Sequence, residues 1–265
     1  MNFLEMTTQD TLNILIAVFA LIVSYVIGSI PFGVVIGKLF CHKDIREYGS
    51  KNIGSTNAIR VLGKPVGFIV FFFDVFKGAF IIILMMILKS TGVYTSPIEL
   101  LWYGATAILG HCFSIFLGFK GGKAVATSLG VVLVLCPMAA INCLIIFVLI
   151  LYITGYVSLA STGATFTVII TGWLLYAFGL TEYTNFLEYF ISNPGLTLNL
   201  LFCVMGTLII VKHFKNYKRL LNGTESNFKK AKKEKKLQEQ QAKLENNNQK
   251  RKKEIIWIIS FLLFN

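Results

Sequence analysis

"VATSLGVVLVLCPMAAINCLIIFVLILYI", residues 125–153, decides how many times this chain crosses a membrane. At ~1.5 Å per residue, this almost entirely apolar run makes about 44 Å of helix. That length exceeds one crossing of a hydrocarbon core of about 30 Å but falls short of two. Pro137, which follows Cys136 near the middle, has no backbone N–H to donate and therefore ends a helix. We predict two short helices, at about 125–136 and 138–153.

The composition places the chain among membrane proteins. Of its 265 residues, 55% are hydrophobic and 14% are charged, and the mean hydropathy is +0.69. Because apolar runs of about 18 residues or more indicate membrane spans, we predict an all-α polytopic membrane protein. Glu5 and Asp10 precede the first run without a basic residue, unlike a cleaved signal peptide, so this span should remain. The apolar runs lie near residues 12–37, 66–88, 98–117, 125–153, 158–180 and 196–212.

Basic residues lie mostly between alternate runs and predict the topology. Lys and Arg are concentrated in the first loop, in residues 110–130 and from Lys212 onward. The loops on the opposite side hold Lys89, Glu182 and Glu188. The positive-inside rule then places the N-terminus outside and the C-terminus in the cytoplasm. This arrangement requires an odd number of crossings, so residues 125–153 cross twice and the chain has seven membrane helices.

The five cysteines form no CxxC pair, and four of them lie within apolar runs. We interpret them as small hydrophobic residues. We expect no disulfide or zinc framework, no other metal and no cofactor.

Four polar segments share the predicted cytoplasmic side, and the first is "DIREYGSKNIGSTNAIRVLGKP", residues 44–65. Small residues let backbone N–H groups approach an anion closely, and an arginine can bind phosphate with two hydrogen bonds. The alternative is an ordinary polar loop. We predict a phosphate site that includes Ser50, Asn52, Thr56, Asn57 and Arg60.

The second segment is "GHCFSIFLGFKGGKAVATSLG", residues 110–130. It is not a Walker A loop, because Leu117 replaces the first glycine and Ala124 the Ser/Thr after the lysine. A glycine pair and a lysine that open a helix would offer free N–H groups, the positive end of the helix dipole and a cation. We therefore predict phosphate binding by Lys120, Gly121, Gly122 and Lys123.

The third and fourth segments are "TGYVSLASTGA", residues 154–164, and "KHFKNYKRLLNGTESNF", residues 212–228. Ser158 and Ser161 are one turn apart, although serines in membrane helices commonly serve as caps or packing contacts. His213 and Asn216 share one helix face. Within the apolar runs, Asp74 and Lys77 are spaced to form a structural ion pair. The supporting residues are Asp74, Lys77, His111 (a structural histidine), Thr127, Ser158, Arg219 and Glu225.

In order and spacing, "GSIPFG", "YGSKNIGSTNAIRVLGK", "GH…FKGGKAVAT", "YVSLAS" and "HFKNYKRLLNGTE" resemble the bacterial acyl-phosphate-dependent glycerol-3-phosphate acyltransferases. The resemblance covers about Gly28 to Phe228. It implies a seven-helix membrane enzyme that moves an acyl chain from acyl phosphate to the sn-1 hydroxyl of glycerol 3-phosphate. The product would be lysophosphatidic acid, in the first step of phospholipid synthesis.

The resemblance also implies residue roles. The positions of Ser50, Arg60 and Lys123 hold phosphate in this family, and those of Ser161, His213 and Asn216 help to hold the substrates. We take Lys123, Ser161, His213 and Asn216 as the catalytic candidates. The sequence departs from the family pattern at Lys51, Ala124, Ser114 and Gly155; the last stands where a basic residue often precedes the "YVSLAS" run.

An acyl phosphate already has a good leaving group, and the sequence has no GxSxG nucleophile elbow. We therefore expect direct attack by the glycerol hydroxyl without an acyl-enzyme. The base is either His213 or a phosphate oxygen of the substrate, and we favour the phosphate. A donor such as acyl-CoA is typical of enzymes with an HxxxxD motif, but here His42 is followed at that spacing by Glu47.

The expected partners are acyl phosphate, glycerol 3-phosphate, membrane lipid and the upstream enzyme that makes acyl phosphate, with no nucleic acid. The expected site is on the cytoplasmic side of a bacterial plasma membrane. The alternative is a transporter or channel for an organic phosphate anion, because carriers also have broken helices. Against it, the polar groups cluster on one side and no inverted repeat is evident.

The last segment has a different composition. We divide the chain into a membrane acyltransferase domain, residues 1–225, and a basic cytoplasmic tail, residues 226–265. The tail contains 11 Lys/Arg and four Glu, and anionic lipid attracts such bases by about 1 kcal/mol each. Its apolar end, Ile255–Phe264, makes only ~15 Å of helix, too short to span. We expect a solvated or interfacial helix, or disorder.

Overall fold

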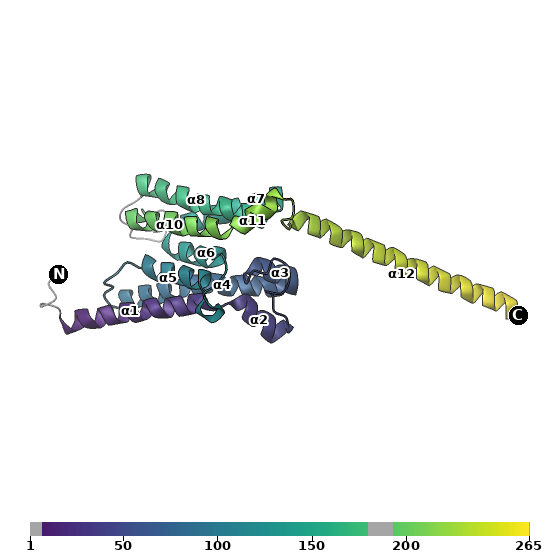
Figure 1. The fold of residues 1–265 in the computed structure, drawn as a ribbon, viewed down its shortest axis with the longest axis horizontal. Coiled ribbons are helices and arrows are strands. Elements are labelled where there is room, and N and C mark those ends of the chain that lie inside the picture. Colours follow the sequence, from purple (N-terminus) through teal and green to yellow (C-terminus); the bar gives the residue numbers. More distant parts are fainter. Residues whose placement is uncertain (1–6, 180–192, 265) are drawn as a thin grey trace.

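The computed structural model describes residues 7–179 and 193–264, and the regular secondary structure of these residues is helical (Figure 1). The helices are α1 (Thr8–Ser29), α2 (Phe32–Cys41), α3 (Ser55–Leu62), α4 (Lys64–Ser90), α5 (Leu101–Cys112), η2 (Ile115–Leu117), α6 (Val125–Leu135), α7 (Pro137–Thr154), α8 (Val157–Phe178), α10 (Gly195–Lys212), α11 (Phe214–Leu221) and α12 (Phe228–Phe264). Figure 1 shows a bundle of the longer apolar helices, with α2, α3 and α11 at the end from which α12 extends.

Five helices in the described residues are long and apolar enough to cross a membrane: α1, α4, α7, α8 and α10. Three shorter apolar segments accompany them: Phe32–Cys41, Leu101–Leu117 and Val125–Leu135. The predicted all-α membrane architecture is therefore confirmed. The count of seven crossings and the orientation stay predictions. Glu182 and Glu188, which contributed to the orientation, lie outside the described residues.

The predicted break in residues 125–153 is present. Helix α6 ends at Leu135 and α7 begins at Pro137, with Cys136 between them at φ −154° and ψ 75°. Only α6 is short, however. Its 11 residues make roughly 16 Å of helix, whereas the 18 residues of α7 are enough to cross. The predicted pair of short helices is therefore one short helix and one of spanning length.

The first apolar run contains a second break that we did not predict. Helix α1 ends at Ser29 and α2 begins at Phe32, so Ile30 and Pro31 separate them. Two carbonyls at the break accept hydrogen bonds from other helices and loops. Lys77 Nζ donates to Ile30 O at 2.8 Å, and Ser114 Oγ donates to Ser29 O at 2.6 Å. The break is tolerated because its polar backbone is paired within the protein.

Glycines bring two helix pairs into close contact. At Gly28 of α1, a Cβ atom would lie 2.3 Å from the carbonyl oxygen of Ala107 in α5. At Gly78 of α4, it would lie 2.1 Å from that of Thr127 in α6, and at Gly130 of α6, 2.0 Å from that of Val75 in α4. Small residues allow membrane helices to pack backbone against backbone. This packing places the start of α6 against the middle of α4.

The tail residues 228–264 form one continuous helix, α12, which extends away from the bundle (Figure 1). Its helical state is one of the two that the sequence predicted. The division into two domains at residue 225 stays a prediction.

Replacement of Gly130 by Ala should lower the midpoint of thermal unfolding in detergent micelles by roughly 3–10 °C, because overpacking costs about 1–3 kcal/mol. Gly163→Ala is the matched control, since its Cβ would meet the flexible end of the Ile150 side chain rather than a backbone atom. Equal midpoints for the two variants would contradict the packing role of Gly130.

Candidate active site

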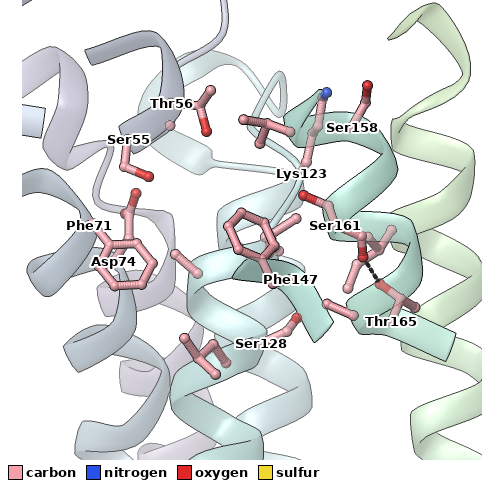
Figure 2. A pocket seen from close by; sticks show the side chains of 18 of the residues that line it. Ser55, Thr56, Phe71, Asp74, Lys123, Ser128, Phe147, Ser158, Ser161 and Thr165 are labelled. Carbon is pink, nitrogen blue, oxygen red and sulfur yellow. Dashed lines mark hydrogen bonds between the residues drawn. The ribbon is translucent and has the colours of Figure 1, made fainter. Parts of the chain in front are cut away.

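The four predicted polar segments line one cavity of about 540 Å³. Figure 2 shows Ser55, Thr56, Lys123 and Ser158 toward one end and Ser128 and Thr165 toward the other, with the Phe147 ring between. The polar and charged lining residues from these segments are Ser50, Asn52, Ser55, Thr56, Asn57, Arg60, Lys64, His111, Lys123, Ser128, Ser158, Ser161, His213, Asn216 and Glu225, and Thr165 follows the third segment. Residues from the middle of α4, α6, α7, α8 and α10 make the remaining wall largely apolar.

Lys123 is held by a chain of hydrogen bonds that crosses three segments. Its Nζ donates to Asn216 Oδ1 at 2.6 Å, and Asn216 Nδ2 donates to Glu225 Oε1 at 2.7 Å. Glu225 Oε2 accepts from Arg219 Nε at 2.7 Å, and Ser158 Oγ lies 3.4 Å from Glu225 Oε1. The loop before α6, the helix α11 and the residues after it are thereby fixed around one amine.

The hydrogen-bonded residues around Lys123 leave a positive charge facing the cavity. Glu225 forms its ion pair with Arg219, which does not line the cavity. Burial lowers the pKa of Lys123 to about 8, an effect that Glu225 partly opposes and that Arg219 and Arg60 reinforce. At neutral pH the amine is therefore still mostly protonated.

Arg60 is a second, partly buried cation of the cavity, which the exposed Lys64 also lines. Its guanidinium carbon lies 5.4 Å from the centre of the Phe228 ring. Burial lowers the pKa of Arg60, but the ordinary pKa of arginine is so high that the side chain stays charged. Within residues 7–179 and 193–264, no carboxylate lies within 4.0 Å of the Arg60 side chain. Two partly buried cations without a direct carboxylate partner favour an anionic ligand.

His213, at the end of α10, is buried and lines the same cavity. Its Nδ1 lies 2.8 Å from the carbonyl of Ile209. Because a carbonyl only accepts, Nδ1 must bear the proton, which leaves Nε2 as the acceptor of the neutral ring. Burial, with repulsion from Lys123, lowers the His213 pKa to about 4. The ring is thus neutral at pH 7.

The predicted use of the glycine N–H groups is wrong. Gly121 N donates to Cys112 O at 3.2 Å and Gly122 N donates to His111 O at 3.0 Å, so neither is free for phosphate. A Cβ at Gly121 would lie 2.0 Å from His111 O. The glycines instead let the loop pack against the end of α5. Lys120 is exposed, and none of Lys120, Gly121 and Gly122 lines the cavity.

The amide of Asn57 organises the first polar loop. Its Nδ2 donates to the carbonyls of Ile45, Tyr48 and Asn52 at 2.7, 3.2 and 2.9 Å, and its Oδ1 accepts from Ser50 N at 2.9 Å. Asn52 Oδ1 accepts from Gly54 N. The Asn57 amide is therefore engaged within the loop. Asn52, whose bond to Gly54 uses only its oxygen, lines the cavity together with Ser50, Thr56 and Arg60.

The predicted ion pair of Asp74 and Lys77 is confirmed, with Lys77 Nζ 2.7 Å from Asp74 Oδ1. His111 Nδ1 lies 3.7 Å from the same oxygen and 3.2 Å from Thr127 Oγ1. All four side chains are buried and connect α4, α5 and α6. Asp74 and His111 also border the cavity, but Lys77 and Thr127 do not. Among the residues with assigned structure, no group of three or more His, Cys, Asp or Glu could hold a metal ion.

A protein-family model described as glycerol-3-phosphate acyltransferase matches residues 18–223. This chain belongs to that family. A glycerol-3-phosphate acyltransferase 2 from Bacillus anthracis is 45% identical over 209 residues, which cover 79% of this chain and 97% of the relative. A glycerol-3-phosphate acyltransferase from Staphylococcus saprophyticus is 43% identical over 215 residues, covering 80% and 98%.

The acyltransferase also resembles a crystal structure of PlsY (YgiH), an integral membrane glycerol 3-phosphate acyltransferase, in its glycerol 3-phosphate form. The TM-score is 0.66 at 37% identity, and the match covers 80% of this chain and 95% of that one. These findings identify a multi-pass membrane glycerol-3-phosphate acyltransferase. They do not support the transporter alternative.

The acyltransferase cavity includes residues that the sequence analysis did not select. Ser55 lies beside the chosen Thr56, and Phe71 and Phe147 belong to apolar runs with no distinguishing pattern. Phe228 is the first residue of the tail helix, for which no role in the site was expected. A sequence signal was available for Ser55 and for Lys64, which also lines the cavity, because both belong to the donor-rich first loop.

The affinity of the acyltransferase for glycerol 3-phosphate should fall as the pH rises through about 8, because Lys123 then loses the proton that makes it a cation. Calorimetric titration from pH 6.5 to 9.5, without acyl donor, measures this. In Lys123→Arg the cation persists throughout the range, so the fall in affinity near pH 8 should disappear. An identical fall in that variant would assign the titration to another group.

Proposed function

We propose that the enzyme transfers a fatty acyl group from acyl phosphate to the sn-1 hydroxyl of glycerol 3-phosphate, without an acyl-enzyme. The products are 1-acyl-glycerol 3-phosphate (lysophosphatidic acid) and phosphate, and the reaction begins phospholipid synthesis. The main support is the cavity itself, which combines Arg60 and Lys123 with a largely apolar wall. An acyl phosphate and glycerol 3-phosphate together present two phosphates and one alkyl chain, which match those surfaces.

The solved relatives support the choice of acceptor and product. PlsY has been crystallised in a glycerol 3-phosphate form and in a lysophosphatidic acid form. The second match has a TM-score of 0.64 at 36% identity and covers 80% of this chain. At such similarity we infer that this chain handles the same acceptor in the corresponding cavity.

Direct transfer is favoured because the cavity has no activated nucleophile among its described residues. A serine nucleophile requires a base within hydrogen-bond reach. Among the described residues, no hydrogen bond joins a cavity serine to His213. Ser158 donates to Glu225 Oε1 at 3.4 Å, but Arg219 already pairs with that carboxylate. Without such a pair, positioning and charge stabilisation would supply catalysis, with Arg60 and Lys123 fixing the phosphates.

In the proposed step, the sn-1 oxygen of glycerol 3-phosphate attacks the acyl carbonyl carbon, and the bond from that carbon to the phosphate oxygen breaks. The hydroxyl proton passes to the departing phosphate. A His213 pKa of about 4 makes the imidazole a weak base, whereas the second pKa of a phosphate monoester is about 6. The phosphate is therefore the better proton acceptor, and Ser161, His213 and Asn216 would orient the substrates.

We further propose that the chain has seven crossings in a bacterial plasma membrane, with the N-terminus outside. Helices α3 and α11, which belong to the first loop and to the segment from Lys212 onward, lie at the end of the bundle from which α12 extends (Figure 1), and Lys123 contacts Asn216 of α11. The positive-inside rule would place this end in the cytoplasm. There it could receive acyl phosphate from the enzyme that makes it.

The test compares palmitoyl phosphate, palmitoyl-CoA and palmitoyl carrier protein as donors to labelled glycerol 3-phosphate, using purified protein. Product should form from palmitoyl phosphate alone. Lys123→Ala should reduce the rate at least tenfold, because the variant lacks a phosphate-binding cation. Product from a thioester, with none from acyl phosphate, would overturn the proposed donor.

If the substrate phosphate accepts the proton, the kcat of the wild type should fall as the pH drops below about 6, the second pKa of a phosphate monoester. It should not hold until the pH approaches the lower pKa of His213. His213→Gln should keep this acid limb at the same pH. A variant with no measurable turnover but unchanged binding of glycerol 3-phosphate would assign the base to His213.

A further inference from the structure

The segment Ser226–Lys230 follows the part of the chain that the family model matches, which ends at residue 223. It is fastened to the turn between α7 and α8 by three hydrogen bonds. Phe228 N donates to Gly155 O, Asn227 Nδ2 to Thr154 O, and Lys229 Nζ to Ile153 O, each at 2.9 Å. The start of α12 is therefore attached to the rim of the cavity.

Gly155 provides the space for this attachment. Its φ is +75°, and a Cβ atom there would lie 2.4 Å from Asn227 Oδ1. Any side chain at residue 155 would therefore clash with the Asn227 amide. The close contact between residue 155 and Asn227 thus requires a glycine at position 155.

Asn227 also sets where α12 begins. Its Oδ1 accepts hydrogen bonds from Lys229 N at 2.9 Å and Lys230 N at 3.2 Å, which is the usual capping of free N–H groups at a helix start. Asn227 is thus bonded both to the end of α7 and to the start of α12, and the next residue, Phe228, lines the cavity. Arg60 then lies 5.4 Å from the centre of the Phe228 ring.

We propose that Phe228 is a positioning residue for Arg60, supplied by the start of α12 and held in place by Asn227 against Gly155. A cation over an aromatic face is attracted without being neutralised. A carboxylate at this place would hold Arg60 equally well but would cancel the charge that a phosphate needs. This inference rests on the proposed phosphate-binding role of Arg60.

The test uses the full chain in lipid nanodiscs. For Phe228→Ala, the Kd of glycerol 3-phosphate or the KM of the acyl donor should rise about threefold to tenfold, because the cation–π contact with Arg60 is lost. The kcat should stay within about twofold of the wild-type value. Phe228→Tyr keeps the ring and should restore the wild-type value, whereas Phe228→Leu keeps only apolar bulk and should not. Phe214→Ala removes a ring that is 73% exposed on α11 and is the matched control.

Asn227→Ala provides a second test, since it removes the Asn227 bond to Thr154 and the cap of α12 but leaves the ring. It should reproduce the Phe228→Ala effect, and the double variant should lose no more than either single one. Additive losses, equal behaviour of the Leu and Tyr variants, or Kd and KM values within twofold of wild type for Phe228→Ala would overturn the proposal.

Binding of glycerol 3-phosphate is measured without any acyl donor, so failure of the proposed donor or proton route would leave this readout intact. Arg60→Gln, which removes the cation, separates the two roles. If Arg60→Gln leaves the Kd and KM unchanged, the phosphate-binding role of Arg60 fails. If it raises either constant while Phe228→Ala does not, only the positioning role fails.

Discussion

The site depends on one constraint: wherever a helix stops inside the bundle, its free backbone polar groups must find partners within the protein. Helix α5 ends at Cys112, and its carbonyl accepts from Gly121 N at 3.2 Å and from Lys212 Nζ at 2.9 Å. The adjacent His111 carbonyl accepts from Gly122 N. These bonds fix the loop that presents Lys123 and the end of α10 that presents His213.

The buried charges are also paired within the protein. Glu225 lines the cavity but is paired with Arg219, which does not, and it is connected to Lys123 through Asn216. Arg60 is held beside an aromatic ring. The buried ion pair Asp74–Lys77 has no net charge, and Lys77 also donates to the Ile30 carbonyl at the break between α1 and α2. The groups that stabilise the fold are thus self-compensating, while those that face the cavity keep a net positive charge for an anion.

Much of this organisation was predictable from the sequence. Hydropathy identified the membrane class, Pro137 identified the break between α6 and α7, and four donor-rich segments identified the residues that line the cavity. The family resemblance also rested on those segments. Local signals sufficed because hydropathy, proline and residue type act at the position where they occur.

By itself, then, the sequence determined the all-helical membrane class, the family and most of the polar cavity lining. Only the tertiary structure decided which groups remain available there. The N–H groups of Gly121 and Gly122 are taken by α5, the Asn57 amide is taken by its own loop, and Phe228 enters from the tail. The physical reason is that a hydrogen bond or a ring contact depends on two partners. When those partners are far apart in the chain, residue type and spacing do not reveal the pairing.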